Sequence, residues 1–143
     1  MTQTWWQTED GFIHWTIHLP KNLRLSSKRS TMGNLTFQIK NTTDSTLNLK
    51  VIARSLTPSV YFETLTRRVV RSTSIKQIQP KREISDERLI MKNQEASMKF
   101  KILFRPHLTL TRDPDFRLQY EISAFRENGA YLTGTGSRVL LAH

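Results

Sequence analysis

The chain has 143 residues and no cysteine, which excludes disulfides, cysteine nucleophiles and thiolate metal sites. Its content of 37% hydrophobic and 24% charged residues, with five glycines and five prolines, is typical of one ordered globular domain over residues 1–143 and excludes collagen-like and low-complexity chains. The formal net charge of +10 at pH 7 favours acidic or polyanionic partners and says nothing about the fold.

The N-terminal segment, MTQTWWQTEDGFIHW, has no basic region followed by an apolar run, which argues against a signal peptide. No run of about eighteen consecutive apolar residues occurs, so we expect no membrane span. We therefore expect a protein of the cytoplasm, with the nucleus as the alternative. Trp5 and Trp6 are predicted to cover one end of the core, and the alternative is an exposed aromatic contact for a partner.

Residues Gly11 to Leu19 alternate apolar and polar side chains, which is the pattern of a half-buried β-strand. Pro20 ends this strand because a proline cannot donate to a strand ladder. His14 and His18 fall on the polar face, about 13 Å apart at the rise of a strand, so both cannot bind one metal ion directly. The sequence predicts a strand here and no metal site.

Met32 to Arg54 contains two further alternating segments, 33–40 and 46–54, with a polar stretch between them. In the first segment Leu35, Phe37 and Ile39 alternate with polar side chains. Because a short polar turn separates two half-buried strands, we predict a β-hairpin. An irregular crossing region follows and leads into another predicted strand that ends at Val70.

The positive charge is concentrated in the middle of the chain. Residues 21–112 carry nineteen Lys or Arg against six Asp or Glu, and residues 67–82 carry six Lys or Arg with no acid. Ser-Thr-Ser and Pro80 interrupt this segment, so we predict a loop or an edge strand. The predicted basic binding surface consists of Arg67, Arg68, Arg71, Lys76, Lys81, Arg82, Lys99 and Lys101.

Ile84 to Met91 is the segment with helical features. Ser85 offers a side-chain cap for a helix N-terminus, and two acidic residues follow it in what would be the first turn. Asn93 comes too soon for more than about two turns. We predict a short helix or a turn.

The last third of the chain again predicts strands. Ala96 to Phe104 and Phe116 to Ala124 both alternate apolar and polar side chains. Asn128-Gly129 is the signal of a two-residue type I′ hairpin, in which both central residues need a positive φ. We expect residues 130–141 to pair back on the preceding strand, with their two glycines marking a bulge or a close backbone approach.

Together these segments predict an all-β protein. Turn signals separate short alternating strands along most of the chain, and at most one short helix interrupts them. We expect a single antiparallel immunoglobulin-like β-sandwich of about seven to nine strands.

Three segments resemble the immunoglobulin-like domains of the major-sperm-protein and hydin (ASH) type, over about residues 30–125. They are Gly33-x-Leu35-x-Phe37-x-Ile39-x-Asn41 with Thr42-Thr43-Asp44 and Leu47, then Ile78-x-Pro80, then Met98-x-Phe100-x-Ile102-x-Phe104-x-Pro106. The resemblance implies a non-enzymatic scaffold domain that binds other proteins, in some members through a basic face for acidic peptides. The chain differs from that pattern in a longer, more basic 65–90 region and in its own final hairpin.

Motifs for catalysis are missing from the sequence. There is no G-x-x-x-x-G-K-[ST] phosphate loop, no G-x-S-x-G elbow and no H-E-x-x-H. Asp113 and Asp115 flank Pro114, with His107 nearby, but a turn explains these residue types better than paired catalytic carboxylates. We expect no enzyme activity and no cofactor.

Two functional hypotheses follow from these patterns. The first is a protein-interaction or assembly module that binds an acidic partner, or pairs through an exposed strand edge with a partner or with a second copy of itself. The second is a basic β-domain that binds RNA or single-stranded DNA, as part of a ribonucleoprotein or viral assembly. Most aromatic residues fall on the predicted core face, so few remain for stacking on bases.

Overall fold

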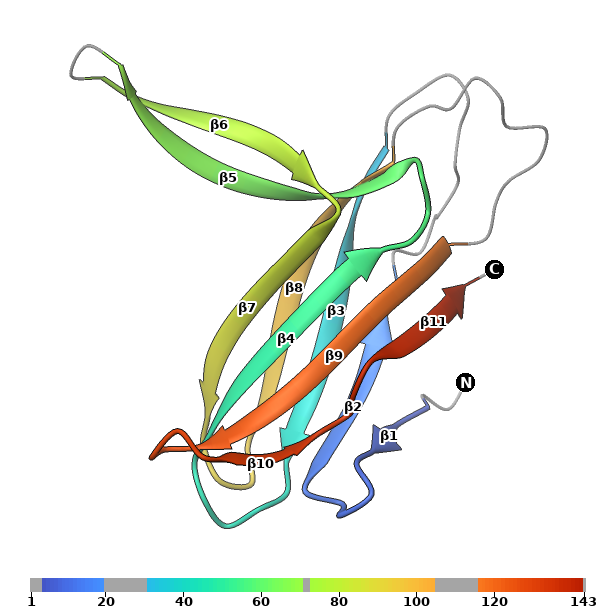
Figure 1. Ribbon diagram of the computed structural model, residues 1–143, viewed down its shortest axis with the longest axis vertical. Helices are drawn as coiled ribbons and strands as arrows, with labels where there is room; N and C mark the ends of the chain where they lie inside the picture. Colours follow the sequence, from blue (N-terminus) through green and yellow to red (C-terminus); the bar gives the residue numbers. More distant parts are fainter. Residues whose placement is uncertain (1–3, 20–30, 71–72, 105–115, 143) are drawn as a thin grey trace.

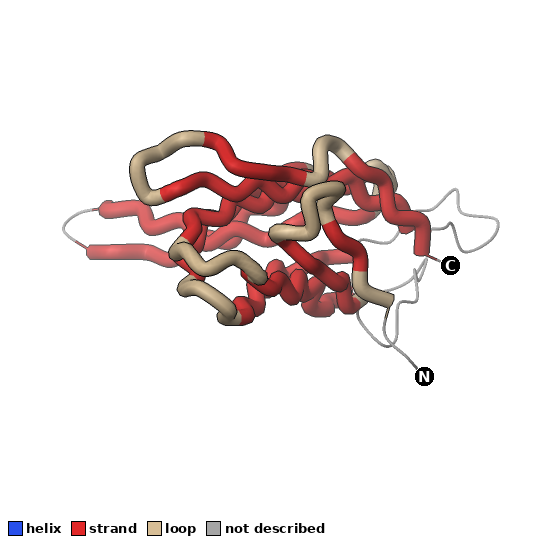
Figure 2. The backbone as a smooth tube through the Cα atoms, turned by 90° about the horizontal axis from the view of Figure 1, so that it is seen from below, coloured by secondary structure: helices blue, strands red, loops and turns tan. Residues whose placement is uncertain are grey.

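The structure is a computed structural model that describes residues 4–19, 31–70, 73–104 and 116–142, with the backbone alone for residues 31, 64–70, 73–79 and 142. In this part of the chain every regular element is a β-strand and no helix occurs (Figures 1 and 2). The strands are β1 (Trp6–Gln7), β2 (Ile13–His18), β3 (Thr31–Asn41), β4 (Leu47–Ser55), β5 (Val60–Val70), β6 (Thr73–Lys81), β7 (Glu83–Ile90), β8 (Glu95–Phe104), β9 (Phe116–Arg126), β10 (Tyr131–Gly134) and β11 (Arg138–Ala142).

The strands form two antiparallel sheets. We call the six-stranded sheet, in the order β1-β2-β3-β8-β5-β6, sheet A, and the five-stranded sheet, in the order β10-β9-β4-β7 with β11 also paired to β9, sheet B. The orders β2-β3-β8-β5 and β4-β9-β10 correspond to strands A-B-E-D and C-F-G of an immunoglobulin constant-type domain. The predicted all-β sandwich is confirmed, with eleven strands in the described residues.

The core lies between the two sheets because each strand alternates its side chains between the two faces. Met98, Phe100 and Ile102 of β8 are buried against residues from sheet B such as Val51 and Ile122. Phe37 lies within 5.7 Å of the rings of both Phe100 and Tyr120, measured between ring centroids, with edge-to-face geometry. The predicted alternation is therefore confirmed in β2, β3, β4, β8 and β9.

The predicted hairpin between residues 33 and 54 is wrong in its pairing. Both segments are strands, but β3 pairs with β2 and β8 in sheet A, whereas β4 pairs with β7 and β9 in sheet B. The chain therefore crosses from one sheet to the other between them. Alternation shows that each strand buries one face, and two strands that face each other across a core have the same pattern as two strands that pair.

Asn41 fixes this crossing. Its side chain is buried, and its Nδ2 donates to the carbonyls of Ser45 at 2.7 Å, Met91 at 3.2 Å and Ile90 at 3.4 Å. Its Oδ1 accepts from the backbone N–H of Thr43 at 3.0 Å and from the Thr43 hydroxyl at 2.6 Å. One amide thus ties the crossing to the turn between β7 and β8.

The predicted short helix at residues 84–91 is wrong, because this segment is strand β7 at the edge of sheet B. The register places Ile90 opposite Leu47, Arg88 opposite Leu49 and Asp86 opposite Val51. Since the β4 partners face the core, Arg88 and Asp86 lie on the core-facing side at an open edge, a known protection against edge pairing. Pairing with β4 outweighs the local preference of Ser85-Asp86-Glu87 for a helix start.

The hairpin after β9 forms as predicted, but its turn type differs. Gly129 has a positive φ of 90°. Among the described residues that are not glycine, only Asn93 has a positive φ. Asn128 therefore lacks the positive φ that a type I′ turn needs at both central residues. The Gly129 N–H donates to the Arg126 carbonyl at 2.8 Å, and the Arg126 N–H donates to the Ala130 carbonyl at 2.8 Å. These contacts are those of a three-residue loop with a bulged glycine.

The close backbone approach predicted for the final hairpin is present at Gly134. A Cβ there would lie 2.6 Å from the Tyr131 hydroxyl and 3.0 Å from the Ile122 carbonyl oxygen. The pairing of β10 with β9 also shifts register between Tyr131 and Thr133, so the bulge in this strand lies before Gly134 and not at either glycine.

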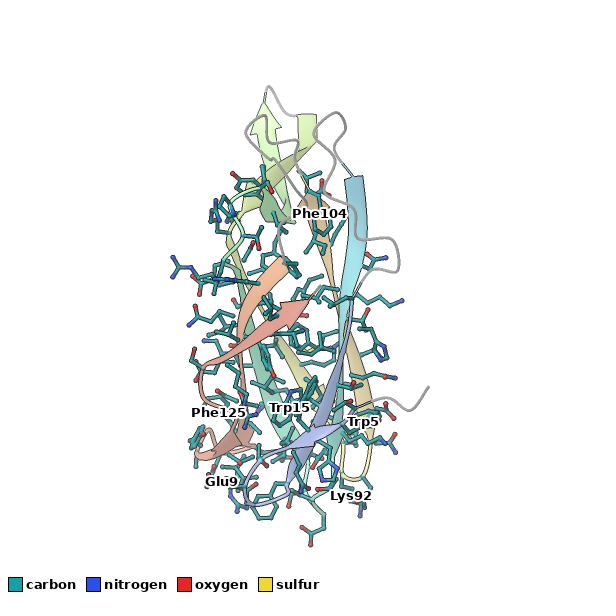
Figure 3. The ribbon with its side chains drawn as sticks, turned by 90° about the vertical axis from the view of Figure 1, so that its right-hand side faces the viewer. Trp5, Glu9, Trp15, Lys92, Phe104 and Phe125 are labelled. Atoms are coloured by element: carbon teal, nitrogen blue, oxygen red, sulfur yellow. The ribbon has the colours of Figure 1, made fainter. Side chains whose placement is uncertain are left out.

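Trp15 and Tyr120 join the two sheets through the core. The Trp15 Nε1–H donates to the Tyr120 hydroxyl oxygen at 3.1 Å, and Trp15 is fully buried (Figure 3). Burial raises the pKa of Tyr120 above its usual value, although the hydrogen bond from Trp15 and the charge of Arg138 oppose that shift. Trp6 stacks on Trp15 with 6.2 Å between centroids, so the prediction that this tryptophan covers the core is confirmed.

Several predictions lie outside the described residues. They concern Arg71 and the turn that contains His107, Asp113 and Asp115.

We expect Tyr120→Phe to lower the free energy of unfolding by about 1–3 kcal/mol, because the buried Trp15 N–H would lose its acceptor. Urea unfolding followed by tryptophan fluorescence measures this change. Tyr131→Phe removes a hydroxyl from an exposed tyrosine and is the matched control, with little expected effect. Equal stability of both variants would contradict the assigned role of the Tyr120 hydroxyl.

We expect Asn41→Asp to be more destabilising than Asn41→Ala, which itself should cost about 1–3 kcal/mol. Aspartate places an acceptor where the Asn41 amide donates to carbonyls, and it adds a buried charge. Asn48→Asp on the exposed face of β4 is the control. Thermal unfolding of the four proteins at neutral pH ranks them, and a neutral Asn41→Asp would contradict the proposed anchoring.

Candidate functional site

Strands β5 and β6 extend beyond the sandwich as a two-stranded arm (Figure 1). β5 pairs with β8 through only Val60, Tyr61 and Phe62, while β5 and β6 continue to pair with each other from Phe62–Lys81 out to Val70–Thr73. We call residues 63–70 and 73–80 the arm. At the rise of a strand its length is about 25 Å.

The arm and β7 are additions to the immunoglobulin order. In that order the strand equivalent to β5 is followed directly by the strand equivalent to β8, whereas here β6 and β7 lie between them in the chain. The 65–90 region that set the sequence apart from the family pattern is therefore the arm together with an extra edge strand. β6 is also an edge strand of sheet A, as one of the two predictions for this segment had it.

The arm has a strongly basic sequence. Residues 64–79 contain Arg67, Arg68, Arg71 and Lys76 and no acidic residue. The register places Arg67 directly opposite Lys76, and Arg68 opposite Ile75.

At the base of the arm, Lys81 and Arg82 differ in their surroundings. The Lys81 side chain is exposed, in register with Phe62. The Arg82 guanidinium donates to the carbonyls of Thr57 at 3.1 Å and Pro58 at 2.8 Å, and it lies 5.1 Å from the Tyr61 ring centroid. Arg82 thus holds the corner at which the chain passes from β6 in sheet A to β7 in sheet B.

Lys99 and Lys101 are exposed on the outer face of sheet A. Their neighbours on β3 in the register are Thr36 and Asn34, so neither lysine faces an acid across this pair of strands. Lys101 directly precedes Ile102, which pairs with Phe62 at the base of the arm. Since Phe62 faces the core, Lys81 lies on the opposite side of sheet A from Lys99 and Lys101. The structure therefore brings these lysines to the base of the arm but not onto one face.

The aromatic side chains near the surface lie elsewhere: Phe12 and Tyr131 are exposed, and Trp5 and Phe125 are half-buried. Lys40 Nζ lies 4.1 Å from the Trp5 ring centroid on the outer side of sheet A, and Phe125 packs against Tyr131 on the outer side of sheet B, 5.8 Å between centroids (Figure 3). No group of three or more His, Cys, Asp or Glu side chains that would suit a metal ion occurs in the described ranges. No helix in them is long and apolar enough to cross a membrane.

Two features of the site are absent from the sequence-based predictions. The corner role of Arg82 has no local signal, because its acceptors are backbone carbonyls more than twenty residues earlier. The early departure of β5 from β8 was also missed. The only available hint was the change near Glu63 from an alternating apolar strand to a basic segment.

We expect Arg82→Ala to lower the free energy of unfolding by about 1–3 kcal/mol, because two backbone carbonyls would lose a charged donor. Lys81→Ala removes the same charge from the neighbouring position and should change stability by less than about 0.5 kcal/mol. Chemical denaturation of both variants makes the comparison. If the two values were equal, Arg82 would have to be assigned to the exposed basic surface alone.

Comparison with known proteins does not assign a family. No family model matches the chain, and no curated protein matches its sequence. Among solved structures, the chain is similar to a FixG-related protein from Vibrio parahaemolyticus (8% identity, TM-score 0.46, covering 92% of this chain and 96% of that one). It is also similar to the putative ApaA protein from Bordetella pertussis (10% identity, TM-score 0.45, covering 99% and 98%). A third is BcpA, the major pilin subunit of Bacillus cereus (10% identity, TM-score 0.46, covering 99% of this chain and 48% of that one). These similarities are too distant to indicate a function.

Proposed function

We propose that the protein is a non-enzymatic interaction or assembly module that binds an acidic protein partner through the arm. The observation that carries the proposal is the arm itself, a two-stranded extension whose residues 64–70 and 73–79 include three Lys or Arg and no acid. A two-stranded ribbon is only marginally stable alone in water. Contact with a partner of opposite charge would stabilise it.

The lysines at the base of the arm support an acidic partner. Lys81, Lys99 and Lys101 are exposed, and none of them has an ion-pair partner in the described part of the chain. Such a set of uncompensated charges raises the association rate with an oppositely charged protein.

A protein partner fits the arm better than nucleic acid does. Binding of single strands combines basic residues with aromatic side chains on which bases stack. Residues 64–79 contain no aromatic residue, and Tyr61 at the base already lies against Arg82. Phe125 and Tyr131 lie beside the turn between β9 and β10. This turn is at the end of the sandwich away from the arm (Figure 1).

The test compares two flexible polyanions, poly-L-glutamate and random-sequence single-stranded DNA of equal length, at low and physiological salt. We expect tighter binding of poly-L-glutamate, and a loss of about tenfold in its affinity in the Arg67→Ala/Arg68→Ala/Arg71→Ala variant. Fluorescence anisotropy of the labelled polyanion gives both affinities.

The control removes three positive charges away from the arm, in Lys50→Ala/Lys92→Ala/Arg126→Ala, and it should retain most of the affinity. Equal losses in both variants would mean that net charge alone drives binding. DNA binding that is tighter than that of poly-L-glutamate, with a steep salt dependence, would support the nucleic-acid function instead. If neither polyanion binds at low salt, the arm is not a basic docking element.

A further inference from the structure

β8 has an open edge beyond the point where β5 diverges from it. On one side β8 pairs with β3 along its whole length, from Glu95 opposite Lys40 to Phe104 opposite Thr31. On the other side only residues 102–104 pair with β5, which then turns away into the arm. Residues 95–101, about 20 Å of strand, have no strand partner on that side in the part of the chain that the structure describes.

The peptide groups that point to this open edge can be assigned. The Gln94 carbonyl accepts from the N–H of Asn41, at the end of β3, so the backbone N–H and C=O of even-numbered residues point to β3. The Ser97 carbonyl accepts from Arg88 Nη1 on β7, so the backbone groups of odd-numbered residues point away from β3, toward the open edge. Because the directions alternate along a strand, the N–H and C=O of Lys99 and Lys101 also point to the open edge.

β7 does not close this edge with its backbone. It belongs to sheet B, where it pairs with β4, and Arg88 is its hydrogen-bond link to β8. A groove of about 620 Å³ lies between the two strands, lined by residues 88–92 and 94–97. Leu89 and Met91 in this lining are more than half exposed, at 57% and 56%. The groove thus offers apolar surface next to unpaired backbone groups.

The charges beside the edge favour an added strand that carries acidic side chains. Lys99 and Lys101 stand on the outer face of β8, and a strand added beside them would place its own alternate side chains next to these lysines. Acidic side chains there form favourable cross-strand pairs. A second copy of this chain would instead bring Lys99 and Lys101 of one β8 against those of the other, and like charges in opposed positions are destabilising.

We propose that β8 accepts an added β-strand from the acidic partner, antiparallel to β8, in the position that β5 leaves after Phe62. The added segment carries acidic residues at alternate positions, next to Lys99 and Lys101, and apolar residues between them, toward the groove and the core edge. Main-chain hydrogen bonds to the Ser97 N–H and to the N–H and C=O groups of Lys99 and Lys101 supply affinity, and the alternating side chains supply specificity. This inference rests on the proposed function, since it names the segment of an acidic partner and the edge that receives it.

The probe is a synthetic peptide of alternating Glu and Val with blocked ends. Binding is measured by isothermal titration calorimetry, and hydrogen exchange by NMR gives the protection of individual amides. We expect the amides of Ser97, Lys99 and Lys101 to become protected when the peptide is added. We expect no such change on the paired side of β8.

Three variants separate the contributions. Ser97→Pro removes one N–H at the open edge and leaves the ladder with β3 intact, so the dissociation constant should rise about fivefold or more. Ser97→Ala keeps that N–H and should bind like the original protein. Lys99→Ala/Lys101→Ala should raise the dissociation constant about threefold and flatten its salt dependence.

The outcomes distinguish this inference from the proposed function. Binding of poly-L-glutamate that depends on the arm, without protection of residues 97–101 by the alternating peptide, would overturn the added strand and leave the arm as the docking element. Protection of these amides that rises with protein concentration and needs no peptide would assign the edge to a second copy instead. If Ser97→Pro does not fold, the exchange experiment on the unmodified protein still decides.

Discussion

The buried amide of Asn41 is the interaction on which the sandwich depends. The chain must pass from sheet A to sheet B directly after β3, and the Asn41 side chain at that point is itself buried and needs hydrogen-bond partners. A buried amide without partners is costly, and the Asn41 Nδ2 donates to the carbonyls of Ser45 and Met91 at once. Because Met91 begins the turn into β8, the same contact anchors this turn, whose residues Met91, Lys92 and Gln94 line the groove.

At both open sides of the sandwich an arginine side chain, rather than a paired strand, reaches across the edge. On one side Arg88 reaches from β7 to the Ser97 carbonyl of β8. On the other side the Arg138 guanidinium of β11 lies 5.0 Å from the ring centroid of Trp15 on β2. In each case a long charged side chain on the core-facing side of an edge strand covers the end of the core while its charged group stays near water. Such edges resist pairing with a similar basic chain, and their positive charge favours an acidic one.

The departure of β5 from β8 links the arm to the open edge. If β5 continued along β8 beyond Phe62, it would pair with the backbone of Lys99 and Lys101 and there would be no arm. Because β5 turns away, the same residues that extend the arm also leave part of β8 unpaired. Arg82 holds this arrangement in place, since its hydrogen bonds to Thr57 and Pro58 fix the start of β5 and the end of β6 together. The arm and the edge are thus one structural feature.

The sequence by itself determined the strands with regular alternation and which of their side chains face the core, because alternation over Leu35–Ile39, Met98–Phe104 and Phe116–Ala124 is the pattern of a half-buried strand. It also determined the basic character of residues 67–82. Only the tertiary structure decided which strands pair, and for this reason the hairpin at 33–54 and the helix at 84–91 were wrong. Pairing depends on contacts between residues far apart in the chain, such as Asn41 with Met91 and Arg82 with Thr57, and alternation within one strand does not record its partner.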